Sequence, residues 1–148
     1  MSGNIDPIYS RIGDLSTNTS GSTIGTGMGQ LISASAADYT GISANYALIF
    51  TAGTNGAFVQ RLRFKAGGSN GAAVMRIFLN NGSIHTTATN NAFYGEISLP
   101  ATTAATTSAT VDIDYPMNFA LPPSWTIYAG LGAATSPGWT CVAVAGQY

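Results

Sequence analysis

The sequence predicts an all-β protein: a single β-sandwich of jelly-roll type that follows an extended N-terminal arm. The main observation is a series of short runs rich in β-branched and aromatic residues, separated by Gly, Pro, Asn and Ser, which is typical of strands. A second observation is that no segment shows the 3.6-residue periodicity of an amphipathic helix. The length of 148 residues suits one domain. The predicted strands are the runs 46–52, 57–66, 72–80, 93–99, 110–121, 125–131 and 139–146.

Residues 1–43 form the predicted arm, and residues 44–148 form the predicted sandwich. The arm includes the run STNTSGSTIGTGMGQ, which is rich in Gly, Ser and Thr and has no sustained apolar periodicity. Such a composition buries too little apolar surface to offset the entropy of ordering, so we expect the arm to become ordered on a partner. The side chains expected to enter shallow pockets on that partner are Ile5, Ile8, Tyr9, Ile12 and Leu15.

Turn residues lie between the predicted strands. Asn55-Gly56, Asn70-Gly71 and Asn81-Gly82 each separate two runs, and Asn-Gly supplies the two positive φ angles of a type I′ hairpin turn. We therefore expect at least two adjacent hairpins. Pro122 and Pro123 must lie outside the strand that begins near Trp125, because proline donates no hydrogen bond to a sheet. Residues 100–110, PATTAATTSAT, are expected to form a surface crossover. Such long connections favour a jelly roll over a meander.

The overall charge argues against nucleic acid and membranes as partners. Only 7% of the residues are charged, against about 25% in ordinary soluble domains, and the net charge is −1. Such a surface has little attraction for phosphates or anionic lipids, and little repulsion against a neighbouring protein. The first residues lack the pattern of a signal peptide, and no apolar run approaches the ~20 residues of a membrane span. We expect a protein that is made in a cytoplasm, stays soluble and joins an assembly.

No catalytic, cofactor-binding or metal-binding residues are predicted. His85 is the only histidine, and no Ser-His-Asp or Cys-His arrangement accompanies it. Cys141 is the only cysteine and lies in an apolar run, so burial is expected rather than reactivity. Asp112 and Asp114 have a spacing that an inverting glycosidase could use, but two carboxylates along one strand face do not flank a cleft. A lone pair of aspartates is equally unspecific for calcium.

One predicted strand carries a ladder of cations. Side chains alternate across a strand, so Arg61, Arg63 and Lys65 share one face with Val59, while Phe58, Gln60, Leu62, Phe64 and Ala66 are expected to face the core. Arg76 extends this basic patch if the hairpin register allows. On a later strand Asp112 and Asp114 share a face. Two interpretations stay open: the charges solubilise an outer face, or they meet complementary charges across an interface, either Asp112 and Asp114 of a neighbouring subunit or acidic groups of a partner.

Four stretches resemble small structural proteins of tailed bacteriophages: GTNGAFVQRLRFKAGGSNGAAVMRIFLNNGS, EISLPATTA, YPMNFALPPSWTIYAGLG and GWTCVAVAGQY. The resemblance covers about residues 45–148 and implies a virion component. Within that group it favours a capsid decoration (cement) protein, which binds the major capsid protein lattice on the capsid exterior, commonly as a homotrimer. It assigns no functional residues. The alternative that it implies is a tail or head-fibre adhesin, which would bind a host receptor or glycan through exposed aromatic residues such as Tyr94, Trp125, Tyr128 or Trp139.

Overall fold

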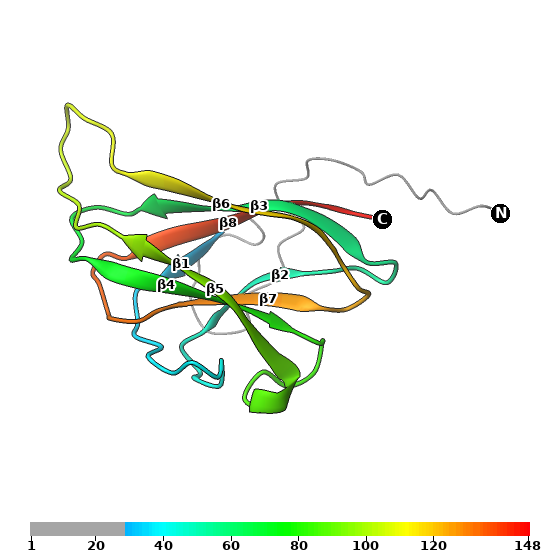
Figure 1. Ribbon diagram of the computed structural model, residues 1–148. Helices are drawn as coiled ribbons and strands as arrows, with labels where there is room; N and C mark the ends of the chain where they lie inside the picture. The colour runs from blue at the N-terminus through cyan, green and yellow to red at the C-terminus, as the bar shows by residue number, and fades with distance from the viewer. Residues whose placement is uncertain (1–28) are drawn as a thin grey trace.

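The computed structural model describes residues 29–148, which form two four-stranded antiparallel sheets packed face to face (Figure 1). The prediction of an all-β sandwich is therefore confirmed. A short 3-10 helix, η1 (Ala88–Asn90), precedes the fifth strand. The strands are β1 (Gln30–Ile32), β2 (Ala47–Thr51), β3 (Ala57–Ala66), β4 (Ala73–Asn80), β5 (Asn91–Leu99), β6 (Asp112–Leu121), β7 (Thr126–Leu131) and β8 (Trp139–Gln147).

The chain passes from one sheet to the other at almost every connection. Sheet A has the order β1-β8-β3-β6 and sheet B the order β2-β7-β4-β5, so among the described strands only β4 and β5 are neighbours in both sequence and space. The expectation of several adjacent hairpins is therefore wrong. Asn55-Gly56 and Asn70-Gly71 lie on connections between the sheets, and Asn81-Gly82 opens the longer connection from β4 to β5. An Asn-Gly pair indicates a turn, but does not say which strand follows in the sheet.

The core lies between the sheets and is built from alternate residues of both. Strand alternation directs one side chain of each pair inward, and the buried cluster between the sheets consists of aliphatic and aromatic residues with Met75, Met117 and Cys141. The largest fully buried apolar side chains are Trp139, Phe64, Phe78, Ile49, Leu62, Met75, Ile77, Leu99, Ile127, Leu131 and Val59. Phe78 belongs to a second, smaller cluster, which is described below.

A bulge in β3 changes which of its residues face the core. Val59 is fully buried, Gln60 is exposed and Leu62 is fully buried, because the pairing register shifts between Val59 and Arg61 on both neighbouring strands. On the β6 side the same shift falls beside Asn118, which has a φ of 53°. The expectation that Val59 shares the face of Arg61 and that Gln60 points inward is therefore wrong. Strict alternation fails because a bulge inserts one unpaired residue.

The sandwich begins earlier in the chain than predicted. Gln30, Leu31 and Ile32 pair with Cys141, Thr140 and Trp139 of β8, so β1 belongs to sheet A and not to an arm. Residues 33–46, which we call the strap, then cross the outer face of sheet B, where Ala36 accepts a hydrogen bond from Arg76 of β4 and Tyr46 packs on Phe78 of the same strand. The boundary between residues 43 and 44 is thus wrong for the described part of the chain. The five apolar residues predicted for docking, Ile5 to Leu15, lie outside the described residues.

Candidate functional site

The predicted charge ladder exists, but its two halves meet within one chain. β3 and β6 are neighbours in sheet A, with Arg63 opposite Asp114 and Lys65 opposite Asp112. Each arginine reaches diagonally: Arg61 Nε lies 3.5 Å from Asp114 Oδ1, and an Nη of Arg63 donates to Asp112 Oδ2. We call Arg61, Arg63, Lys65, Asp112 and Asp114 the charge ladder. The expected partner charges of a neighbouring subunit are supplied by the same chain.

The charge ladder lies on the surface. Lys65 Nζ donates to the Thr110 carbonyl oxygen at 2.5 Å, next to the ion pairs. The hydrogen bond from Arg63 holds the pKa of Asp112 below its ordinary value, and the charges of Arg63 and Lys65 add to this effect. Exposed pairs of this kind contribute little free energy of unfolding, typically about 0–1 kcal/mol. Their clear effect is to place charge on β6, an edge strand that would otherwise invite pairing with another chain.

Arg76 does not extend the charge ladder. It lies on β4, which is in sheet B, whereas the ladder lies on sheet A. Its exposed fraction is only 8%, so it is a buried charge rather than part of a surface patch. The prediction for Arg76 is therefore wrong, because it assumed that β3 and β4 form a hairpin.

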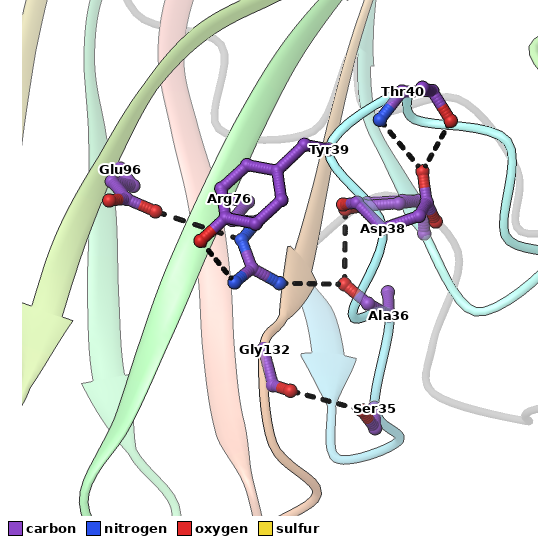
Figure 2. A network of polar contacts seen from close by, with 9 residues as sticks. Ser35, Ala36, Asp38, Tyr39, Thr40, Arg76, Glu96 and Gly132 are labelled. Carbon is purple, nitrogen blue, oxygen red and sulfur yellow. Dashed lines mark hydrogen bonds and ion pairs between the residues drawn. The ribbon is translucent and has the colours of Figure 1, made fainter. Parts of the chain in front are cut away.

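Arg76 is enclosed by the strap and by β5 (Figure 2). One Nη donates to the Ala36 carbonyl oxygen at 3.3 Å, and the other donates to the Tyr39 hydroxyl oxygen at 2.9 Å. The Tyr39 ring lies over the guanidinium, with Cζ 4.0 Å from the ring centroid. Glu96 is opposite Arg76 on β5, and its Oε2 lies 3.6 Å from Nε. Arg76 is thus stabilised by a ring face, two acceptors and a carboxylate.

Hydrogen bonds within the strap determine its shape. Asp38 Oδ1 accepts from the Thr40 amide and hydroxyl, both at 2.9 Å, and from the Ile42 amide at 3.1 Å, while Oδ2 accepts from Ser43 N at 3.2 Å. Burial alone would raise the pKa of Asp38, but these hydrogen bonds outweigh it and hold the pKa below its ordinary value. Tyr39 therefore lies in a loop whose shape is stabilised by hydrogen bonds to the Asp38 carboxylate.

Aromatic packing joins the strap to sheet B. The rings of Tyr46 and Phe78 meet at 4.9 Å, and the Tyr46 hydroxyl lies within hydrogen-bonding distance of two strap carbonyls, those of Ala36 and Asp38. Burial, with the negative charge of Asp38 nearby, raises the pKa of Tyr46 to about 12. Phe78 packs on Phe93 at 5.2 Å, and Phe93 meets Tyr39 edge to face at 5.6 Å. A row of aromatic rings thus runs from the small buried cluster to the surface.

Two of these rings are exposed, and no sequence pattern indicates that they lie together. Tyr39 is 58% exposed and Phe93 is 44% exposed. Tyr39 falls in the small-residue segment predicted as an arm, and Phe93 opens a predicted strand. Among the aromatic residues considered for an adhesin, Trp139 is fully buried, whereas Trp125 and Tyr128 are partly buried. Tyr94 is 39% exposed and packs against Phe119 and Tyr115 at the edge of the sandwich.

The remaining chemically notable residues are His85 and Cys141. Cys141 is fully buried, and burial raises the pKa of its thiol, which disfavours the thiolate. His85 stacks on Tyr128 with ring centroids 4.6 Å apart. Within residues 29–148 no group of three or more His, Cys, Asp or Glu residues is placed to hold a metal ion. In the same part of the chain, no helix has the length and apolarity needed to cross a bilayer.

Comparisons with protein-family models, with curated proteins and with solved structures found no match to this chain.

Proposed function

We propose that this chain is a structural protein of a bacteriophage virion, which decorates and stabilises the capsid by binding the lattice of the major capsid protein. In this proposal it acts as a homotrimer on the capsid exterior, after synthesis in the host cytoplasm, and has no catalytic or cofactor-dependent activity. The resemblance of residues 45–148 to small phage structural proteins motivates the proposal. General features such as low charge do not select it, since they fit many proteins that form assemblies.

The structural observation that agrees best with the proposal is the order of the strands. In sheet A the order is 1-8-3-6, and in sheet B it is 2-7-4-5. This order supports the jelly-roll interpretation, two interlocked Greek keys of four strands each, an architecture found in viral capsid domains as well as in lectins and cupins. A fold shared by several functions cannot select one of them. The resemblance is therefore the reason for proposing a capsid protein, and the strand order is consistent with that function.

The surface of the domain adds a second support. Arg61 and Arg63 are paired with aspartates of the same chain, so two of the three positive charges of the charge ladder are neutralised within the chain. A nearly neutral surface rich in small polar residues offers little electrostatic repulsion to close neighbours on a lattice. Capsid contacts through residues 5–15, and through the charge ladder, remain predictions.

The experiment that tests this function is a count of chains per purified virion. Virions are isolated from the phage that encodes the chain, and the protein is quantified against the major capsid protein by mass spectrometry. A decoration protein is expected in a fixed, high ratio to the major capsid protein. The low copy number of a tail component, or absence from the particle, would contradict the proposal.

Two sets of variants then locate the docking contacts. A shortened chain that begins at Gly29 keeps β1 and should bind capsids more weakly than the full chain if residues 1–28 dock. Arg61→Ala and Arg63→Ala are measured separately at low and high salt. If the charge ladder meets capsid carboxylates, both variants lose affinity and the loss shrinks as salt rises, because screening weakens exposed charge pairs. Unchanged capsid binding of both variants at every salt concentration would mean that the charge ladder forms contacts only within its own chain.

The alternative function is an adhesin that binds a host receptor or glycan from a tail or head fibre. The observation that favours it is the pair of exposed rings, Tyr39 and Phe93. The virion count distinguishes this alternative, because an adhesin of a tail fibre would be present in few copies.

A further inference from the structure

We propose that Tyr39, Phe93 and Glu96 form a binding site for a neutral hexopyranoside on the outer face of sheet B. The inference goes beyond capsid decoration and gives the ligand class of the alternative function, glycan binding, but it does not depend on whether the chain lies on a capsid or on a tail. The three residues come from two elements: Tyr39 from the strap, and Phe93 and Glu96 from β5. The contacts that bring them together are the ring contact of Tyr39 with Phe93 and the shared neighbour Arg76.

A bulge in β5 places Phe93 and Glu96 on the same face. Ile77 pairs with Gly95, but the next residue, Phe78, pairs with Phe93, so the register shifts and β5 contains one additional residue at Tyr94. Without this shift, residues three apart on a strand would point to opposite sides of the sheet. Glu96 faces Arg76 and Phe93 contacts Phe78, and both of those residues lie on the outer face of β4. Bulges of this kind commonly re-aim side chains at binding sites.

Arg76 holds the Tyr39 ring in place from the side of the ring that faces sheet B. Its guanidinium packs against one face of the Tyr39 ring at 4.0 Å and donates to the Tyr39 hydroxyl oxygen, and the ring edge meets Phe93. The ring is therefore held at several points while Tyr39 stays 58% exposed. A rigid aromatic surface costs little conformational entropy on binding. The apolar C–H groups on one face of a pyranose carry partial positive charge and pack well against the electron-rich face of such a ring.

Glu96 supplies the polar part of the site. Its side chain is 45% exposed, and its distance of 3.6 Å from Arg76 Nε is too long for a hydrogen bond. In the described part of the chain, that buried Nε has no hydrogen-bond partner. The carboxylate thus keeps lone pairs that can accept hydrogen bonds from two neighbouring hydroxyls of a sugar. A ring face with an adjacent carboxylate acceptor is the minimal chemistry that recognises a monosaccharide.

The charges select a neutral sugar over an anionic one. The two Nη groups of Arg76 donate to Ala36 and Tyr39, its Nε is buried, and the Tyr39 ring covers the guanidinium, so a ligand meets the carboxylate of Glu96 rather than the cation. A phosphate or sialic acid would be repelled. A protein partner fits less well, because a stable protein interface buries about 800 Å² on each side, whereas the exposed platform consists of two rings.

The test is saturation-transfer NMR on the full chain with methyl β-D-glucopyranoside, methyl β-D-galactopyranoside and, as an anionic probe, the methyl glycoside of N-acetylneuraminic acid. We expect transfer to the ring C–H protons of at least one neutral glycoside and none to the anionic probe. Tyr39→Ala and Phe93→Ala should each reduce affinity about tenfold or more. Glu96→Gln should also weaken binding. Tyr94→Ala removes an exposed aromatic ring on the adjacent position of the same strand, and should leave binding unchanged.

Several outcomes would overturn the proposal. Absence of transfer to both neutral glycosides would do so, as would an equal loss in Tyr39→Ala and Tyr94→Ala, which indicates unspecific contact with aromatic rings. If Tyr39→Ala lowers the melting temperature, its loss of binding cannot be assigned to the site, and Glu96→Gln becomes the test. Unchanged sugar binding in Glu96→Gln would then contradict the proposed site. Sedimentation of each variant identifies another occupant: a change of oligomeric state in Tyr39→Ala without sugar binding would assign the rings to contact with a second copy.

Discussion

The Asn70 side chain binds both the backbone N–H and the backbone carbonyl of Gly138, a residue that is distant from it in the sequence. Asn70 Oδ1 accepts from Gly138 N at 2.8 Å, and Asn70 Nδ2 donates to Gly138 O at 3.1 Å. The Asn70 backbone also exchanges hydrogen bonds with Thr102, at 2.9 and 3.1 Å. One residue therefore connects the β3–β4, β5–β6 and β7–β8 loops at one end of the sandwich. The sequence had predicted it only as part of a hairpin turn.

Asn70→Ala should lower the free energy of unfolding by about 2–4 kcal/mol, because a buried polar group left without a partner costs about 1–3 kcal/mol. Asn70 is 5% exposed and Gly138 is buried, so water cannot readily replace the lost contacts. Urea unfolding measures the loss. The control is Asn55→Ala, an exposed residue of another Asn-Gly pair, which should change stability by less than about 0.5 kcal/mol. Equal effects of the two variants would contradict the role of Asn70.

Two arginines should respond differently to the same substitution. Arg76→Ala removes hydrogen bonds to Ala36 and Tyr39 and leaves a gap beneath the Tyr39 ring, so we expect a loss of about 1–3 kcal/mol. Arg63→Ala breaks a surface ion pair and should cost about 0–1 kcal/mol. Thermal or urea unfolding of both variants checks the difference. A larger loss for Arg63 would mean that the charge ladder stabilises the fold more than surface pairs usually do.

Gly95 should not tolerate a side chain. A Cβ built there would overlap the Tyr115 hydroxyl, which reaches β5 from the opposite sheet. Gly95→Ala should therefore destabilise the sandwich by about 1–3 kcal/mol, the usual cost of overpacking. Tyr115→Phe removes the overlapping oxygen, so the double variant should recover part of the loss. A double-mutant cycle by chemical unfolding tests this coupling, and simple additivity would contradict the contact.

Asp38 should make the strap sensitive to acid. Its pKa is lowered in the folded state, so its stabilising effect is fully present above the ordinary Asp pKa, about 3.9, and is lost as pH falls through the lower folded value. Asp38→Asn should abolish this part of the pH dependence below about pH 4. Hydrogen exchange of the Thr40, Ile42 and Ser43 amides, followed as pH falls, reports on the strap alone. Equal acid sensitivity in Asp38→Asn would assign the effect to other carboxylates.

The strands of the sandwich could be predicted from sequence to a large extent. The run 57–66 coincides with β3, and the runs 72–80 and 125–131 differ from β4 and β7 by one residue at their start. These strands are long and rich in β-branched or aromatic residues, so local pattern is sufficient. β1 was missed because it has three residues, of which only Ile32 is buried. A pattern that short is not visible without the strand it pairs with.

The candidate site could not be predicted, because it depends on which segments become neighbours. Arg76 was expected to extend the basic patch of β3 if the hairpin register allowed, but sheet order places it in the other sheet, under a strap whose composition suggested an arm. Phe93 and Glu96 share a face only because of the bulge at Tyr94, which no local pattern indicated. The ion pairs of Arg61 and Arg63 with Asp114 and Asp112 lie within one chain, and the expected contact of these charges with another subunit or a partner stays a prediction. Periodicity reports the face of a strand, whereas its neighbours are decided by the whole topology.

The position of β3 has a consequence for translation. β3 lies between β6 and β8 in sheet A, and both of these neighbours follow it in the sequence. As the nascent chain emerges, the ten residues of β3 are present before either strand that satisfies their backbone hydrogen bonds. β3 has no neighbouring strand until β6 has emerged, and its second edge stays open until β8 has emerged. Such an intermediate is the kind of species that chaperones bind and that aggregates at high concentration. Slow expression at low temperature should therefore increase the yield of soluble protein.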